Sequence, residues 1–399
     1  MKVLRIMKVQ KILKALKILL QMLVGAAVGF GGVKLIFLLA GSDDAAPASS
    51  ADEGIDWWFL ALSIVISILS LAVCLVLHTI LHEAGHLLFG LLTKYRFSSF
   101  RVFCWMVVKE AGGLRLRRYN IAGTMGQCIM LPPSASEATP YFWYNAGGVL
   151  VNLFLVAASL LLLRTFDCGI VLTAFLIMMA FVGGFMGFMN GLPLKLNGLS
   201  NDGRNIMLLK RRPAYRRYFA STLLVVDAQN RGVRVKDMPA EWFDNKPLEH
   251  PDEIFDVSQR LLWLCRLEDG GKYAEAHAVA EDIAAHEEQL PPLYRLEFNG
   301  ERTLIELLTS ARKEVIEKIW TKELERHLRQ NSKYSAGKCV ILYAYELLFR
   351  RDVEAASQYL QLLETRKSKF PYPGEVRMAE KMTEDIDALA KSQGSASTN

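Results

Sequence analysis

The sequence lacks the cysteine patterns of a disulfide-stapled protein or of a zinc knuckle. Its 399 residues include six cysteines, and none of them forms a Cys-x-x-Cys pair. Cysteines scattered in this way indicate neither a disulfide framework nor a cysteine-ligated metal site. The chain also lacks a large excess of charge, because its formal net charge is only +6. Basic loops beside apolar runs account for that excess, so we expect no nucleic-acid partner.

What the chain does have is apolar sequence, concentrated before residue 195. Hydrophobic residues make up 52% of the chain. Four runs, 18–40, 57–92, 141–163 and 170–192, each reach the length of about 20 residues that crosses a bilayer as a helix. The predicted fold class is therefore mainly α: a multi-span helical membrane protein with a cytoplasmic α-helical domain.

The charges between the runs predict a topology. The first run follows a lysine-rich start, and the linker 41–56 carries only acidic charge. Because cytoplasmic loops are enriched in lysine and arginine, this places the N-terminus in the cytoplasm. The basic segments 93–140 and 210–217 then fall on the same side. We expect a bacterial cell-membrane protein with four spans and both termini cytoplasmic.

A cleaved signal peptide is the alternative reading of the first run. Small residues follow it, as at a cleavage site, but the run contains Lys34 and exceeds the usual apolar core of a signal peptide. These features favour a retained span, and the later topology is the same either way.

The second run contains the sequence His82-Glu83-Ala84-Gly85-His86. Histidines at i and i+4 project from one face of a helix and can share a metal, and the glutamate beside the first can reach a metal-bound water. Zinc would lower the pKa of that water to about 7, and Glu83 would take its proton. The alternative is a pair of polar residues at a helix end.

The position of this motif favours the metal site. No charged residue precedes Glu83 between Trp57 and Leu81, and burying two imidazoles and a carboxylate in hydrocarbon is costly unless they pair or bind metal. With Lys94 and Arg96 at the cytoplasmic headgroups, His86 lies about 12 to 15 Å inside that boundary. The metal would be submerged, yet nearer the cytoplasm.

A catalytic zinc needs a third protein ligand, and Asp202 is the candidate that the topology favours. The fourth run returns to the cytoplasmic side, and a turn-rich stretch leads from it to Asp202. Asp202 could equally be the N-cap of a helix that starts at Gly203, so its own surroundings leave both roles open. His78 continues the histidine stripe, but it would lie about 12 Å from His86 along the helix axis. A packed polar contact is the better prediction for His78.

These motifs resemble those of the site-2 protease family of intramembrane zinc metalloproteases. The likeness covers residues 57–208 and includes the His-Glu-x-x-His motif, Gly147 to Asn152, Asn190, Pro193 and Asp202-Gly203. Val149 stands where the family usually has proline, and Asn201 precedes the aspartate where leucine is common. The resemblance implies that His82, His86 and Asp202 bind Zn²⁺ and that Glu83 is the catalytic base.

The same resemblance implies that Asn152 is a polar active-site residue that positions substrate or stabilises an oxyanion. An interhelical hydrogen bond is the alternative role for this asparagine. Glycines at 183, 187 and 191 form a small-residue stripe that lets another helix approach closely. We expect this face to pack against the helix with the histidines.

Between the second and third runs, residues 96–130 alternate in polarity and are broken by glycines, which predicts a small β-rich membrane-associated loop region. An extended edge there could pair with an unwound substrate strand. From residue 210 the chain becomes charged and helical in periodicity, and segments 263–283 and 343–363 are similar to tetratricopeptide-like helix pairs.

The expected organisation has four parts. They are the N-terminal basic segment with the first span and the acidic linker (1–56), the intramembrane metalloprotease core (57–208), the cytoplasmic α-helical domain (209–390) and a disordered tail (391–399). The helical domain is a possible binding surface for a cytoplasmic protein partner.

The sequence therefore predicts a multi-pass zinc endopeptidase that hydrolyses a membrane-spanning protein or peptide within the lipid bilayer, near the cytoplasmic side. A non-catalytic metal-binding scaffold or receptor, recruiting partners through its helical domain, is the main alternative. A metal-handling membrane protein is disfavoured because no other acidic or histidine-rich path crosses the spans. A peptidase domain merely tethered by spans conflicts with the position of the motif inside an apolar run.

Overall fold

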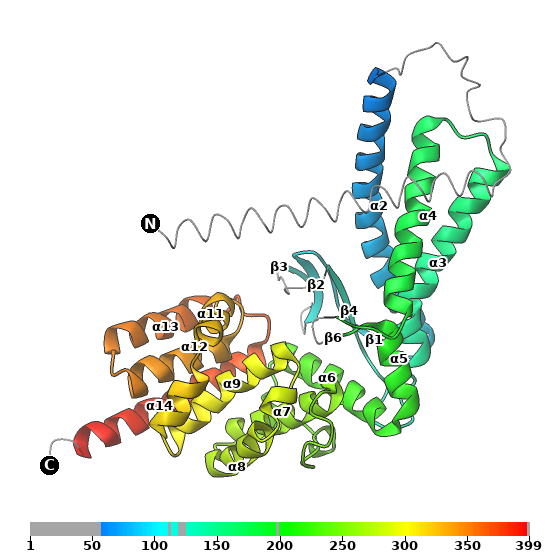
Figure 1. Cartoon of the computed structure of the whole chain (residues 1–399). Coiled ribbons are helices and arrows are strands. Elements are labelled where there is room, and N and C mark those ends of the chain that lie inside the picture. Colours follow the sequence, from blue (N-terminus) through cyan, green and yellow to red (C-terminus); the bar gives the residue numbers. More distant parts are fainter. Residues whose placement is uncertain (1–56, 111–112, 119–124, 197–198, 397–399) are drawn as a thin grey trace. The chain divides into compact units, whose positions relative to one another are not determined.

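The structure, a computed structural model, describes residues 57–110, 113–118, 125–196 and 199–396 (Figure 1). The predicted first span, the acidic linker and the choice between a span and a signal peptide lie outside these residues. Helices dominate the described chain. A four-stranded antiparallel sheet and a two-stranded one, β5 (Lys195–Leu196) with β6 (Leu199–Ser200), accompany them. The prediction of a mainly α protein is confirmed.

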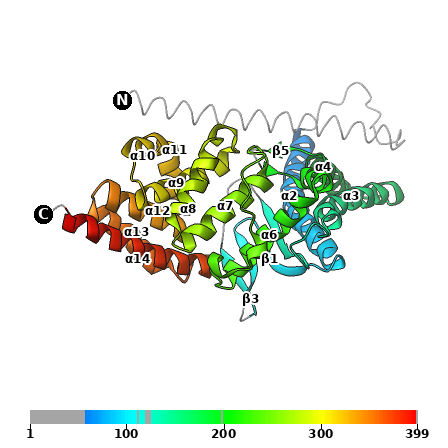
Figure 2. The same ribbon diagram turned by 90° about the horizontal axis from the view of Figure 1, so that it is seen from below.

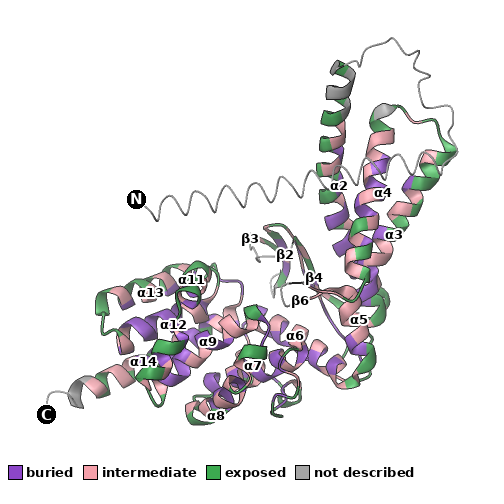
Figure 3. Cartoon of the chain, in the orientation of Figure 1, coloured by how far each residue is buried: buried purple, intermediate pink, exposed green. Residues whose placement is uncertain are grey.

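Within the described residues, three helices are long and apolar enough to cross a membrane: α2 (Trp57–Leu92), α3 (Phe142–Thr165) and α4 (Ile170–Gly191). Their bounds lie within two residues of the runs predicted from hydropathy. Many of their large apolar side chains are exposed, among them Leu62, Ile68 and Phe154 (Figure 3). Such faces are suited to lipid, because hydrocarbon solvates apolar side chains as well as a protein core does.

The described chain divides into two compact units, and the division passes through α2, α3 and α4. One unit consists of residues 57–81 with Val149–Phe188 and is held by a small core around Cys74, Met179 and Val182. The other consists of His82–Gly148 with the chain from Met189 onward. The motif His82 to His86 belongs to the second unit.

The four-stranded sheet occupies the region where short strands were predicted. It contains β1 (Arg96–Val102), β2 (Trp105–Glu110), β3 (Gly113–Arg118) and β4 (Gly126–Leu131), in the order β3-β2-β1-β4. All three pairings are antiparallel. Along β3, exposed Leu114 and Leu116 alternate with arginines, as the two-residue period of a strand requires.

The C-terminal helical region, which we define as residues 202–396, consists mainly of helices packed on one another (Figure 2). Its helices are α5 (Asp202–Arg211), α6 (Pro213–Asn230), α7 (Ile254–Asp269), α8 (Tyr273–Ala284), α9 (Pro292–Leu308), α10 (Lys313–Ile319), α11 (Lys322–Asn331), α12 (Ala336–Ala344), α13 (Val353–Arg366) and α14 (Pro373–Ala396), with single turns at Val235–Asp237, Ala240–Trp242 and Glu287–Gln289 and a π-helical turn at Tyr345–Phe349. The segment 263–283 covers the end of α7 and most of α8, which pack together, and the segment 343–363 covers the last two residues of α12, the π-helical turn and most of α13.

Helix α14 continues to Ala396, into the segment for which we predicted a disordered tail. Arg351 donates a hydrogen bond of 2.8 Å to the Gln393 side chain, and the Ser392 hydroxyl donates to the Leu389 carbonyl. These contacts extend the helix beyond what the small, polar composition of the segment indicates. Residues 397–399 lie outside the described chain.

Candidate metal centre

Three side chains predicted as metal ligands come together at one point. His82 and His86 lie one turn apart on α2, with their Nε2 atoms 3.2 Å apart. The Asp202 Oδ2 atom lies 3.2 Å from His82 Nε2 and 3.5 Å from His86 Nε2. These three atoms form a nearly equilateral triangle.

The size and chemistry of this triangle fit a tetrahedral zinc ion. Ligand atoms about 2.0 to 2.1 Å from a tetrahedral ion are about 3.3 Å from one another, close to the separations observed here. The Asp202 Oδ2 atom is shielded from solvent and makes no well-formed hydrogen bond. A carboxylate oxygen that binds a cation has these same properties. Two imidazoles and one carboxylate are also a common catalytic zinc set, in which the fourth position stays open for water or substrate.

The main-chain carbonyl of Tyr144 orients the second histidine. His86 Nδ1 donates a hydrogen bond of 2.7 Å to this carbonyl, which leaves Nε2 unprotonated and turned toward the triangle. A carbonyl partner of this kind fixes both the tautomer and the ring plane of a metal-binding histidine. The Tyr144 ring is itself held, because it stacks on Tyr95 at 4.9 Å between centroids.

Glycines let α3 approach the histidines closely. A Cβ at Gly85 would lie 2.4 Å from the Gly147 carbonyl oxygen, so the two backbones are in direct contact. A Cβ at Gly148 would lie 2.5 to 2.7 Å from three atoms of the His82 ring. Gly147 and Gly148 therefore supply the space in which the His82 imidazole lies, a reason for these glycines that the family resemblance alone does not give.

Glu83, the predicted base, lies against strand β4. Its side chain is almost fully buried, at 9% exposure, and the backbone N–H of Cys128 donates a hydrogen bond to its carboxylate. A Cβ at Gly126 would lie 2.4 Å from Glu83 Oε1. The Tyr144 hydroxyl donates to the Cys128 carbonyl at 2.6 Å. Glu83 and Tyr144 thus both bond the same residue of β4.

Asp202 is placed by the start of α5. The sequence leaves open whether Asp202 caps a helix that begins at Gly203. In the structure the helix begins at Asp202 itself. Asn201 is the N-cap, and its side chain accepts a hydrogen bond from the Arg204 N–H. Burial alone would raise the pKa of Asp202, but the two imidazoles beside it hold its pKa well below the usual range. The carboxylate is therefore an anion at neutral pH, as a metal ligand must be.

The structure places Asn152 beside His78. Within the unit formed by residues 57–81 and Val149–Phe188, His78 Nδ1 lies 3.0 Å from Asn152 Oδ1, and His78 Nε2 donates to the Met179 carbonyl at 2.9 Å. Both side chains are fully buried. His78 makes the packed polar contact we expected, and Asn152 makes an interhelical hydrogen bond. A Cβ at Gly183 would meet the His78 ring, so this member of the glycine stripe faces α2 as expected.

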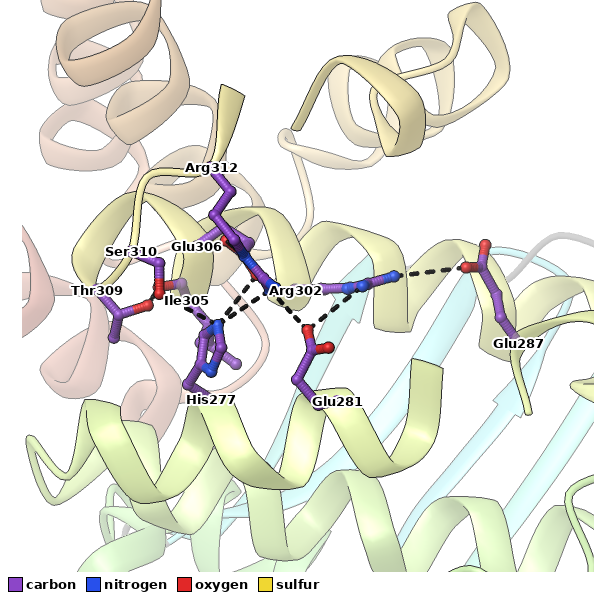
Figure 4. Close-up of polar contacts among 9 residues, drawn as sticks. All are labelled: His277, Glu281, Glu287, Arg302, Ile305, Glu306, Thr309, Ser310 and Arg312. Atoms are coloured by element: carbon purple, nitrogen blue, oxygen red, sulfur yellow. Dashed lines mark hydrogen bonds and ion pairs between the residues drawn. The ribbon is translucent and has the colours of Figure 1, made fainter. Parts of the chain in front are cut away.

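A second group of possible ligands occurs among the described residues, formed by His277, Glu281 and Glu306 (Figure 4). The Arg312 guanidinium lies among these three side chains: it is 3.1 Å from His277 Nε2, 2.7 Å from Glu281 Oε1, and bonded to Glu306. The chain therefore supplies its own cation at this point. We regard the group as an ion-pair network that joins α8 to α9.

Comparison with family models, with curated proteins and with solved structures found no match to this chain. Interpretation of the site therefore rests on its own residues. Of those predicted, His82, His86 and Asp202 converge, and Glu83 follows the first of them on α2. Strand β4 lies in the region predicted to be β-rich, but the contacts of β4 and Tyr144 with the site were not predicted; the glycine at 126 is a sequence signal of the close approach there.

Proposed function

We propose that this protein is an intramembrane zinc metalloendopeptidase of the site-2 protease type. The observation that carries the proposal is the triangle of His82, His86 and Asp202 donors, with the Glu83 carboxylate on the adjacent residue. This group lies toward one end of α2, a helix long and apolar enough to cross a membrane. A hydrolytic site in that position suits substrates that are themselves embedded in the bilayer.

His82, His86 and Asp202 would hold the ion. When bound, zinc supplies Lewis acidity that brings the pKa of a water near 7 and polarises a peptide carbonyl. Glu83 would accept the proton of the attacking water and pass it to the amine that leaves as the peptide bond breaks. The Cys128 N–H fixes one side of the Glu83 carboxylate during this transfer.

Strand β4 supports a proposal for how substrate binds. A transmembrane helix hides its peptide bonds, so a substrate must unwind before hydrolysis. Among the described strands β4 pairs only with β1, which makes it an edge of the sheet, and it passes Glu83. We propose that an extended substrate segment lies along this edge and pairs with positions of β4 other than Cys128, whose two main-chain groups already bond Glu83 and Tyr144.

We also propose a membrane topology for the protein and a structural role for Asn152. A bacterial cell membrane, four spans and cytoplasmic termini are supported by the distribution of lysine and arginine between the apolar runs. This topology puts the metal site nearer the cytoplasmic face. The contact between Asn152 and His78 favours the structural role of this asparagine, and its catalytic role stays a prediction.

The experiment compares the wild type with Glu83→Gln in detergent, on a peptide substrate that contains a transmembrane helix. Zinc content is measured in both, and Glu137→Gln, at an exposed position, is the matched control. We expect Glu83→Gln to keep its zinc and lose cleavage by at least about 100-fold, the lower end of the usual range for a general base. Equal cleavage by all three proteins would refute the mechanism. Tight zinc binding without any cleavage by the wild type would favour the metal-binding scaffold.

A further inference from the structure

Asp202 is the first residue of α5, so the direction of its carboxylate depends on how this helix is anchored. The histidines have rigid support, because both lie inside the long helix α2. The third ligand instead follows the connection 192–201 between α4 and α5, which contains the paired strands β5 and β6. Two anchors hold the start of α5, one on each side of Asp202.

Asn201 provides the first anchor. Its Oδ1 atom accepts hydrogen bonds from the N–H groups of Leu194 and Arg204, at 3.1 and 2.9 Å. Its Nδ2 atom donates to the carbonyls of Met189 and Leu192, at 2.5 and 2.6 Å. Both donors and both acceptor positions of the carboxamide are used. One side chain thus ties the end of α4 to the beginning of α5.

Glu253 provides the second anchor. Arg204, two residues after Asp202, places Nη2 2.7 Å from Glu253 Oε1, and both side chains are largely buried, at 18% and 15% exposure. Glu253 precedes α7, yet its side chain does not cap that helix. Lys195, on strand β5 before Asp202, donates to the Asp252 carbonyl. Two adjacent residues at the start of α7 therefore hold the segment that carries the third ligand.

We propose that Asn201 and Glu253 are positioning residues for the metal centre. Glu253 connects the beginning of α7 to the segment that carries Asp202. The C-terminal helical region therefore helps to set how firmly Asp202 binds the ion. The inference deepens the proposed function and rests on its assignment of Asp202 as a zinc ligand. It concerns metal affinity, which can be measured without any substrate.

The expected effect follows from the tolerance of zinc coordination. Ligand distances vary by only about 0.2 Å in good sites, and loss of an outer partner of a ligand commonly weakens metal binding by about 10- to 100-fold. We expect Glu253→Gln to weaken zinc binding by about 10-fold, because Asn201 remains. Asn201→Ala should weaken it by about 100-fold, since four hydrogen bonds are lost.

The test measures Zn²⁺ affinity by competition with a chelator and the visible spectrum of the Co²⁺-loaded full chain in detergent. The variants are Glu253→Gln, Asn201→Ala, Asn201→Asp and the charge exchange Arg204→Glu with Glu253→Arg. Asn201→Asp keeps the two accepted hydrogen bonds and serves if the alanine variant fails to fold. The control is Asp282→Asn, which breaks a 2.7 Å ion pair with Arg260 inside the helical region, away from α5.

The proposal predicts weakened zinc binding and an altered cobalt spectrum in the Glu253 and Asn201 variants, wild-type values in the control, and partial recovery of affinity in the charge exchange. Wild-type affinity and spectrum in Glu253→Gln and in a folded Asn201 variant would overturn it. An equal loss in Asp282→Asn would also overturn it, because general destabilisation would then explain the effect. If the wild type binds zinc but cleaves no peptide, the proposed function fails while the positioning role can still be confirmed.

Discussion

A methyl group added at Gly148 is expected to expel zinc from the site. In Gly148→Ala the new Cβ would lie 2.5 Å from His82 Cε1, whereas ordinary contacts begin at 3.4 Å. The imidazole must therefore retreat by about 0.9 Å, or α3 must move by as much. Either movement is several times the roughly 0.2 Å by which zinc–ligand distances vary. His82 would cease to be a ligand.

The loss should exceed that caused by removing an outer partner of a ligand, which is about 10- to 100-fold in affinity. We expect zinc binding to weaken at least 100-fold, which corresponds to about 2.7 kcal/mol. The assay is chelator competition in detergent, together with the cobalt spectrum. Gly184→Ala is the matched control. Gly184 lies on α4, a helix as apolar as α3, and a Cβ added there meets nothing within 4 Å. Wild-type zinc affinity in Gly148→Ala would refute the placement of His82 against α3.

Three further predictions concern other parts of the chain. Gly85→Ala places a Cβ 2.4 Å from the Gly147 carbonyl oxygen; we expect it to lower both the melting temperature and zinc affinity, whereas Ala84→Gly should lower only the melting temperature, and unchanged affinity in Gly85→Ala would contradict the close contact. Arg312→Ala removes a cation from Glu306, whose side chain is 1% exposed, and should cost about 2 kcal/mol of unfolding free energy, less than for a fully buried pair because Arg312 is partly exposed. Denaturant unfolding should show almost no cost for Lys313→Ala at an exposed pair, and equal costs would contradict the network. Burial raises the pKa of Glu301 to about 7, so the folded state binds this proton more tightly than the unfolded state does. The stability that comes from protonated Glu301 should then be present in mild acid and be lost as the pH rises from about 5 through 7. The melting temperature should therefore fall less steeply with pH across this range in Glu301→Gln than in the wild type. An equal slope of melting temperature against pH in both proteins would contradict the shift.

The three long apolar helices among the described residues could be predicted almost to the residue because their signal is local. A helix in hydrocarbon must satisfy its own backbone and present apolar side chains over about 20 residues, and both requirements are visible in one continuous run. The same holds for the pair His82 and His86, whose proximity follows from one turn of helix. Asp202 required a topological argument, since nothing in the local sequence distinguishes a ligand from a helix cap.

The roles of Tyr144, Cys128 and Glu253 could not be predicted, because each acts through a partner distant in sequence. Tyr144 orients His86 with its main-chain carbonyl, and Cys128 holds Glu83 with its main-chain N–H. Every residue except proline has the same donor and every residue the same acceptor, so side-chain identity carries no information about such contacts. The helix start near Asp202 was recognised, but the residue that caps it was placed one position too late.

The glycines of the site share one physical cause. Gly85, Gly147 and Gly148 let α2 and α3 meet at backbone distance, and Gly203 does the same at the end of α4, where a Cβ would lie 2.2 Å from the Gly191 carbonyl oxygen. Longer side chains could span wider gaps between helices. Histidine and aspartate side chains are short, so they cannot meet when the helices are farther apart. Three short donor side chains can converge only where the backbones pack closely, and the Asp-Gly pair places the donor and the close contact on adjacent residues. The spacing of glycines around the donors thus follows from the short reach of these side chains, and it predicts which positions tolerate no side chain more directly than hydropathy does.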